Sequence, residues 1–173
     1  TGVGAGEALE LASVVTHDGD TTTGAIDIDN AADANVTVNS LTTADGDITY
    51  DQTGAFALLI GDIVSDAVNL DDDTVTITAQ GSIDALADTA GTEEVRGANI
   101  SITTTAGGIG TGAASTFTTL DVNATVSFSA ATATDGSNIL IDDQVGDMPV
   151  QLITAGAGDV TLNAADGSEE TVT

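Results

Sequence analysis

The chain has 173 residues, which suits one domain or a stretch of a longer repeat array. It carries 28 acidic residues and a single basic one, for a formal net charge of -27, and it has no cysteine. This balance excludes most nucleic-acid binding and attraction to an anionic membrane surface, because both need clustered Lys and Arg. The absence of cysteine excludes disulfides and thiolate chemistry.

The composition is not that of a disordered acidic tail, which pairs high charge with low hydrophobicity. Hydrophobic residues make up 41% of the chain, and the mean hydropathy is +0.20. Only 2% of residues are aromatic, but a narrow core of stacked Val, Ile and Leu layers does not require more. No span approaches the roughly 18–20 apolar residues of a membrane helix, so we expect no membrane insertion. With no initiator Met and no signal peptide, we interpret the chain as a mature fragment or an excised piece.

Short runs of apolar–polar alternation, bounded by Gly, Asp and Asn, recur along the chain and predict short strands. One set of positions is mostly Ile, Val, Leu or Phe, and the other is mostly Thr, Ser, Asp or Asn, which predicts one packed and one wet face. The predicted strands lie at 25–29, 35–39, 47–50, 74–78, 99–103, 125–129, 138–142 and 159–163. We assign 1–23 to an N-terminal cap or joining segment and 24–173 to a solenoid repeat region.

The predicted strands repeat together with their turns. Residues 24–54 align with residues 136–167 when one gap is allowed. The paired positions are Ile26 and Ile28 with Ile139 and Ile141, and Val36 and Val38 with Met148 and Val150. Other comparable strands start at steps of 27, 25 and 26 residues, at Ile48, Val75, Ile100 and Val126. A period in the twenties built from short strands is typical of a solenoid, in which stacked turns bury an apolar face that no single turn can bury.

We therefore predict an all-β fold, a parallel β-solenoid (β-helix) of short strands with Gly- and Asp-rich turns. A β-sandwich is the alternative, because it also uses many short alternating strands at regular spacing. The internal repeat, the scarcity of aromatic residues and the density of Ala and Gly favour the solenoid.

Three segments resemble repeat-rich β-solenoid surface proteins of bacteria, of the filamentous-haemagglutinin and giant-adhesin kind. They are GANISITTTAGGIGT at 97–111, GSNILIDD at 136–143 and GAGDVTLNAADGS at 156–168. The likeness of repeat style extends over about residues 24–168. The resemblance implies an extracellular or cell-surface location and a structural or adhesive role, and it implies no catalytic residues.

Acidic clusters supply the candidate metal ligands, because Ca²⁺ takes about six to eight oxygen ligands and carboxylates two apart on a turn can converge on it. The candidate ligands are Asp18, Asp20, Asp45, Asp47, Asp71, Asp73, Asp142 and Asp143. The clusters lack both the EF-hand spacing and the calcium-binding nonapeptide repeat, so hydrated Asp-rich turns are the alternative. With no lysine to offset the acids, we expect cations to stabilise the fold in either case.

The catalytic signals are weak. His17, the only histidine, could join Asp18 in a hydrolase, but no G-x-S-x-G turn exists, and we interpret His17 as an exposed turn residue. A β-helix polysaccharide lyase needs a basic residue to abstract a proton. We expect Arg96 to form a local ion pair beside Glu93 and Glu94 instead.

Two further motifs have a structural interpretation. Residues 107–110 are glycine-rich but lack the G-x-G-x-x-G frame, which favours a turn over a phosphate site. The Thr runs at 74–78 and 103–105 could present hydroxyl arrays of the kind found on ice-binding solenoids. Because Thr-x-Thr does not recur at one fixed position in each turn, we interpret these residues as ordinary outward strand residues.

We predict a structural, non-catalytic module of an extracellular fibre, surface layer or adhesin that self-associates. The open ends of a solenoid expose unpaired backbone groups, so its expected partners are copies of itself and cations, with glycans as a further candidate. Calcium-dependent binding of glycans or proteins is the alternative function, and a polysaccharide-degrading β-helix enzyme is a remote one. We expect no nucleic-acid partner and no cofactor other than Ca²⁺.

Overall fold

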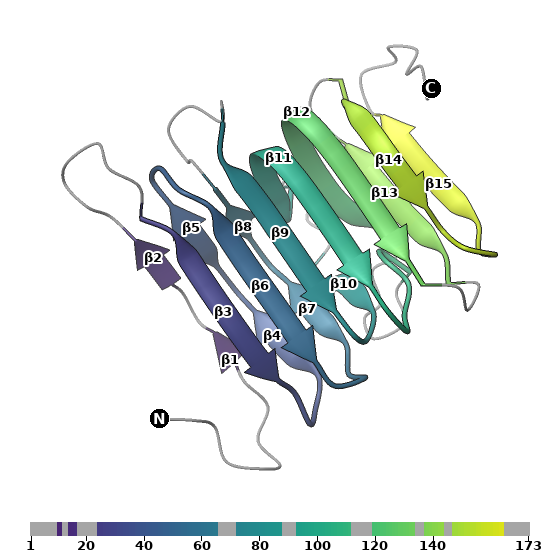
Figure 1. Ribbon diagram of the computed structural model, residues 1–173, viewed down its shortest axis with the longest axis horizontal. Coiled ribbons are helices and arrows are strands. Elements are labelled where there is room, and N and C mark those ends of the chain that lie inside the picture. Colours follow the sequence, from purple (N-terminus) through teal and green to yellow (C-terminus); the bar gives the residue numbers. More distant parts are fainter. Residues whose placement is uncertain are drawn as a thin grey trace.

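The computed structural model describes residues 10–11, 14–16, 24–65, 72–87, 93–111, 119–133, 137–143 and 147–164. Strands account for 60% of this part of the chain, and it contains no helix. In chain order (Figure 1) the strands are β1 (Glu10–Leu11), β2 (Val14–Thr16), β3 (Ile26–Ala31), β4 (Val36–Val38), β5 (Leu41–Thr43), β6 (Ile48–Thr53), β7 (Leu58–Ile60), β8 (Ile63–Val64), β9 (Thr74–Ala79), β10 (Ile83–Ala85), β11 (Val95–Thr104), β12 (Leu120–Thr132), β13 (Ile139–Asp143), β14 (Val150–Thr154) and β15 (Val160–Ala164).

The paired strands of the described residues are all parallel. One sheet has the order β1-β4-β7-β10, and the second has 11 strands and includes the ladder β3-β6-β9-β11-β12-β14. This ladder forms the face toward the viewer in Figure 1. The chain winds as a parallel β-solenoid of about five turns, which confirms the predicted fold class. The β-sandwich alternative is wrong, because sandwich sheets pair their neighbouring strands antiparallel.

The alternation of residue types sets the two faces of each strand, as the sequence predicts. In β9 the apolar side chains are buried and the threonines between them are half-buried on the outer surface. The same pattern runs through β6 and through the second half of β11. Because successive side chains of a strand point to opposite faces, each strand adds one short apolar row to the interior.

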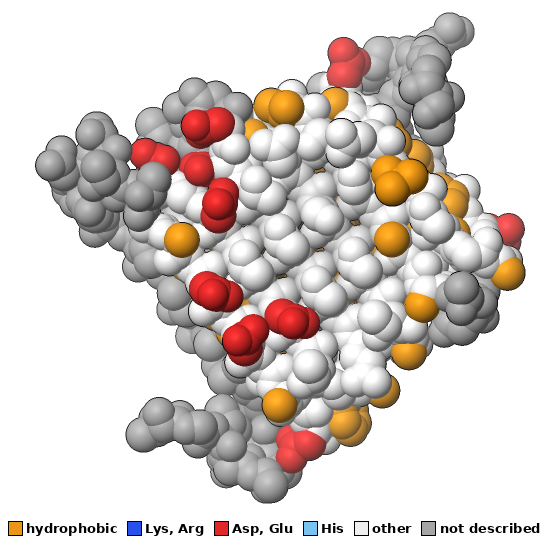
Figure 2. All heavy atoms as spheres, viewed as in Figure 1, with side chains coloured by type: hydrophobic (Ala, Val, Ile, Leu, Met, Phe, Trp, Pro, Cys, Tyr) orange, Lys and Arg blue, Asp and Glu red, His pale blue; other side chains and the backbone are white. Residues whose placement is uncertain are grey.

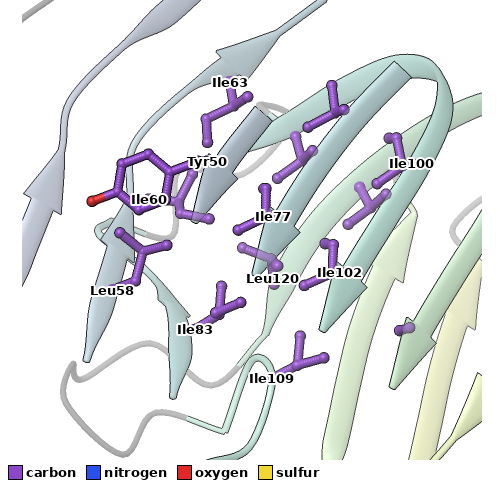
Figure 3. Close-up of a cluster of buried hydrophobic side chains, with 14 of the residues drawn as sticks. Tyr50, Leu58, Ile60, Ile63, Ile77, Ile83, Ile100, Ile102, Ile109 and Leu120 are labelled. Atoms are coloured by element: carbon purple, nitrogen blue, oxygen red, sulfur yellow. The ribbon is translucent and has the colours of Figure 1, made fainter. Parts of the chain in front are cut away.

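Stacked turns align these rows into columns of side chains that fill the core. The paired positions of the two central columns are Ile26, Ile48, Val75, Ile100 and Phe128, and Ile28, Tyr50, Ile77, Ile102 and Ala130. Figure 3 shows members of both columns packing against side chains from the other strands of each turn. Full burial of one such aliphatic side chain stabilises the fold by about 1.5–3 kcal/mol.

The repeat alignment derived from the sequence is wrong in register. Ile139 pairs with Ile109 and with Val160, and Ile109 pairs with Ile83, so Ile139 stacks on the β1-β4-β7-β10 sheet rather than standing where Ile26 stands. The strand β14 pairs with β12 on the outer ladder, whereas the alignment equated it with the β4 region. Turns of unequal length caused the error, because a single gap cannot keep several corners in register.

The predicted strand start at Val126 is also wrong. Ile100 pairs with Phe128, and Val126 is 53% exposed. A register shift between β11 and β12, at Gly97 and Asn99, displaces the alternation of β12 at this point. On the ladder β3-β6-β9-β11-β12-β14, residues that pair on successive turns are 22 to 28 positions apart in the sequence. They are Ile26, Ile48, Val75, Ile100, Phe128 and Val150.

Polar side chains at strand ends hold the corners that follow them. The hydroxyl of Thr43 donates to the carbonyl of Gly46 at 2.7 Å, and the hydroxyl of Thr132 donates to Ser137 at 3.0 Å. Gln52 does the same through its amide, which donates to the carbonyl of Phe56 at 2.9 Å. These bonds satisfy carbonyl groups that the sheets cannot reach, and they fix where each turn of chain bends.

At Gly54 only glycine fits the corner. Its φ of 99° lies in the region that side chains rarely adopt, and an added Cβ would lie 2.1 Å from the carbonyl oxygen of Ala32 on the preceding turn. The glycine-rich segment 107–110, predicted as a turn, bends on both sides of Ile109, and Ile109 itself pairs with Ile83 and Ile139.

The division of the chain at residue 23 stays a prediction. Within 1–23 the structure describes β1, which pairs with β4, and β2, which pairs with β5. Across the described residues, no helix is long and apolar enough to cross a membrane.

Candidate functional site

Those predicted calcium ligands that the structure describes do not gather in one place. Asp18, Asp20 and Asp71 lie outside the described residues, as does His17. Asp45, Asp47 and Asp73 lie at the corners before β6 and β9, and Asp142 and Asp143 end β13. Nowhere in the described ranges do three or more His, Cys, Asp or Glu side chains form a group that could hold a metal ion.

The corners that carry Asp47 and Asp73 stack on successive turns, although 26 positions separate these two residues in sequence. The backbone N–H of Gly46 donates to Asp73 Oδ2 at 2.6 Å, and the backbone N–H of Thr74 donates to Asp47 Oδ1 at 2.8 Å. Asp73 is 8% exposed, whereas Asp47 is exposed. Each carboxylate therefore accepts an N–H group of the other turn, and charge-assisted bonds of this kind are about twice as strong as neutral ones. We call this arrangement the reciprocal clamp.

Similar bonds link other corners. Asn35 Oδ1 accepts the N–H of Ala57 at 3.1 Å, and Asn138 Oδ1 accepts the N–H of Asp159 at 2.8 Å. Glu94 Oε2 accepts the N–H of Asp121 at 2.9 Å. Side-chain oxygens at corners thus serve as acceptors for the next turn, which gives Asp and Asn a structural role that turn propensity alone does not describe.

A row of acids crosses successive turns on another part of the large sheet. Asp121 pairs with Asp142, while Asp62 and Glu94 directly precede the paired residues Ile63 and Val95. Glu94 and Asp121 are each 2% exposed. We call Asp62, Glu94, Asp121 and Asp142 the acidic row. Of these four acids, the sequence predicts only Asp142 as a candidate ligand. The other three share a pattern visible in the sequence, because each is followed directly by Ile or Val.

The acidic row places like charges on neighbouring strands. Neighbouring strands lie about 4.8 Å apart, and two like charges at that distance repel by about 0.9 kcal/mol in bulk water and more near a protein interior. The one arginine reduces this repulsion at one end, because Arg96 Nη2 lies 3.1 Å from Asp62 Oδ1. The predicted ion pair thus exists, but its partner is Asp62 on the preceding turn rather than Glu93 or Glu94. Both side chains are more than a third exposed, so the pair contributes at most about 1 kcal/mol.

Tyr50, the only tyrosine, lies in the middle of a short chain of polar contacts inside the first turns. The amide of Asn30 donates to Tyr50 Oη at 3.3 Å, and Tyr50 Oη donates to Gln52 Oε1 at 3.4 Å. Burial raises the pKa of Tyr50 above its ordinary value of 10.0, and the bond from Asn30 opposes this in part. The arrangement satisfies a buried hydroxyl and brings Gln52 toward the corner that it holds.

Comparisons with known proteins do not add to this picture. A scan against protein-family models gives no match, and searches of curated proteins and of solved structures give none either.

Proposed function

We propose that this chain is a structural, non-catalytic module of an extracellular fibre, surface layer or adhesin, and that it self-associates by adding turn upon turn. The observation that carries the proposal is an open strand edge at one end of the described part of the solenoid. Within the described residues β15 pairs with β13 alone and β14 pairs with β12 alone, so each presents an edge of backbone donors and acceptors. An open parallel edge of this kind is a template for a further strand.

Side-chain exposure at the same end supports this proposal. Val160 continues a column whose earlier members, including Ile83, Ile109 and Ile139, are 0% exposed, yet Val160 itself is 44% exposed. A further turn would cover Val160 as the inner turns cover their neighbours. That turn could belong to a longer polypeptide or to a second copy, and the proposal for this chain is a second copy, added in the same direction.

The charge of -27 makes this association dependent on salt. Two copies that approach end to end bring like charges together, and salt at physiological strength screens such repulsion beyond about 8 Å. End-to-end contacts between identical copies join different surfaces, so they extend a filament rather than close a dimer. An exterior of acids and hydroxyls keeps such an array soluble, which suits an extracellular or cell-surface location.

Sedimentation velocity across a salt series tests this proposal. We expect the average mass to grow with protein concentration at physiological salt and to fall at low ionic strength. Val160→Asp puts a charge on the proposed contact and should abolish the growth. Val126→Asp is the matched control, because Val126 is 53% exposed on β12, a strand whose edge toward the open end is already paired with β13 and β14, and the change in charge is the same. A wild-type chain that stays monomeric at every salt concentration would contradict the proposal.

The acidic row favours a second candidate function, that of a calcium-dependent module for glycans or partner proteins. Its acids lie in register on successive turns, and a divalent cation near them would relieve their repulsion even without the group of three or more ligands that the described residues lack. Thermal melts in EDTA and then in added CaCl₂, at fixed ionic strength, separate specific binding from screening. Specific binding predicts a higher melting temperature with calcium that Asp142→Asn reduces and Asp27→Asn, on β3, does not. A melting temperature that calcium does not change would exclude a specific calcium site and leave general screening as the only effect of cations.

A further inference from the structure

The outer ladder carries a regular array of hydroxyl groups. Thr49, Thr76, Ser101 and Ser129 pair directly with one another across β6, β9, β11 and β12. One step along the strands, Thr78 pairs with Thr103. We call these six residues the hydroxyl face. At these paired positions Thr-x-Thr occurs only in β9, as expected from the sequence, but a single hydroxyl recurs at one position of all four strands, which turns of unequal length conceal in the sequence.

Thr104 is the exception within the Thr runs of the sequence. Its side chain is buried, and its hydroxyl donates to the carbonyl of Gly107 at the following corner. Thr103 and Thr105 on either side of it face outward, with Thr105 exposed. The run at 103–105 thus divides by the alternation of the strand, with only alternate hydroxyls on the surface.

The strand pairing gives this face two fixed repeats. Adjacent strands lie about 4.8 Å apart, and alternate residues of one strand lie about 6.6 Å apart. No register shift interrupts the pairing of β6 with β9 or of β9 with β11, and Figure 1 shows these strands side by side with little twist. The array ends at β12, because the shift after Phe128 places Leu152 of β14 opposite Ser129. The hydroxyls thus form a nearly flat net with a defined boundary.

The net is also uncharged, in a molecule that is otherwise strongly acidic. The outward acids of this ladder are Asp27 and Asp29 on β3 and Asp51 on β6, and Figure 2 shows acidic side chains gathered on that side of the face. The middle of the same view, over β9 and β11, is free of acidic colour. A neutral partner fits this surface. An anionic partner, or the same face of a second copy, would meet the carboxylates at its edge.

The hydroxyls of the net are available to such a partner. Within the described part of the chain, none of the six takes part in a side-chain hydrogen bond to another residue. Each hydroxyl has one donor and two acceptor sites, so each can hold more than one water molecule. A threonine adds a methyl group beside its hydroxyl, which limits the directions from which water can approach. Because the strand ladder holds the groups in place, little ordering is required when they bind together.

From this arrangement we propose that the hydroxyl face binds ordered water and, through it, the surface of ice. The shorter repeat of the net is close to the repeat of water oxygens along the basal axes of hexagonal ice, so a row of hydroxyls stays in step with that lattice across four strands. A crystalline polysaccharide is the other neutral lattice with repeating hydroxyls. Flat aromatic side chains are the groups that pack on sugar rings, and the described outward positions of β6, β9 and β11 carry none. This activity does not depend on the association of solenoid ends.

Ice-affinity partitioning and an ice-recrystallisation assay test the proposal on the 173-residue chain. We expect the wild-type chain to be enriched in slowly grown ice and to slow recrystallisation. The double variant Thr76→Leu/Ser101→Leu changes the centre of the net and should reduce enrichment at least tenfold. Thr37→Leu is the matched control, because Thr37 is a half-buried outward threonine on β4, in the other sheet, and it should bind ice as the wild type does. Circular dichroism checks that each variant keeps its strands.

A second variant tests the same face independently if the double variant Thr76→Leu/Ser101→Leu does not fold. Thr103→Lys adds a long charged side chain at a half-buried outward position and should also reduce enrichment in ice. A wild-type chain that the ice excludes would overturn the proposal, as would equal enrichment of wild type and both folded net variants. Binding to microcrystalline cellulose or chitin without binding to ice would assign the face to a polysaccharide. A dimer that the net variants abolish would assign it to a second copy. Polysaccharide binding without ice binding, or a dimer of this kind, would each overturn the proposal that the face binds ice.

Discussion

Replacing Asp73 by alanine should destabilise the fold, although it removes one acid from a chain of net charge -27. Asp73 is 8% exposed, and its Oδ2 accepts the N–H of Gly46 at 2.6 Å. A hydrogen bond to a charged group contributes about 1.5–3 kcal/mol, and its loss leaves the buried N–H of Gly46 without this acceptor. Removing one charge also removes its repulsion from neighbouring acids, which raises stability by up to about 0.8 kcal/mol for each like charge some 5 Å away in water. We therefore expect a net loss of about 1–2 kcal/mol.

The matched control is Asp29→Ala. Asp29 is exposed on β3 and stands directly opposite Asp51 on β6, and like charges placed opposite each other destabilise a sheet. This substitution should leave the free energy of unfolding unchanged or raise it by a few tenths of a kcal/mol. The two substitutions change the charge equally, so their difference in sign isolates the reciprocal clamp. Asp73→Asn keeps a neutral acceptor oxygen and should fall between them.

Urea denaturation followed by circular dichroism measures these differences. It should be run in EDTA and again with calcium at fixed ionic strength, because a metal-ligand role for Asp73 predicts a loss that is larger with calcium. A clamp made by hydrogen bonds predicts the same loss in both solutions. If Asp73→Ala were as stable as Asp29→Ala in EDTA, the assignment of Asp73 to the clamp would be wrong.

Three further substitutions test the core, a corner and the buried hydroxyl. Ile77→Ala should lower the free energy of unfolding by about 2–5 kcal/mol, because Ile77 is 0% exposed. Val126→Ala should change it by less than about 0.5 kcal/mol, and similar losses for both variants would contradict the assigned register. Gly54→Ala should lower stability by at least about 1–3 kcal/mol from backbone strain alone, and a neutral result in urea titration would rule out the close contact with Ala32. Above pH 10 the native chain should lose stability, because the raised pKa of Tyr50 means that the unfolded chain releases this proton first. The contribution is complete below the unfolded pKa of 10.0 and is lost as the pH rises through the folded pKa. Since the chain has one tyrosine and neither lysine nor cysteine, Tyr50→Phe should remove this alkaline loss, and its persistence would assign it to another group.

The sequence predicts the class of fold because period-two alternation and a repeat in the twenties are local signals. It does not predict the register, because turns of 22 to 28 residues place Phe128 rather than Val126 above Ile100. The reciprocal clamp shows the same limit. Asp47 and Asp73 are both visible as turn acids, but the bond that each accepts from the other turn's backbone exists only once two corners stack.

The two surfaces with proposed roles follow from the same register. The alternating Thr residues of β9 are plain in the sequence, but the row that joins Thr76 to Ser101 and Ser129 depends on pairing across three turns. Likewise the acidic row depends on stacking of Glu94 and Asp121, which sequence reasoning missed because neither residue lies in an Asp-rich turn. A sequence method would need the correct corner lengths before it could find either surface.

Electron microscopy of the 173-residue chain at physiological salt tests the proposed stacking of copies most directly. End-to-end stacking predicts rods whose length grows with protein concentration while their width stays that of a single solenoid. Val160→Asp should give single particles, and Val126→Asp should still give rods. Dispersed particles of one size for the wild-type chain, at every concentration and salt, would contradict end-to-end stacking.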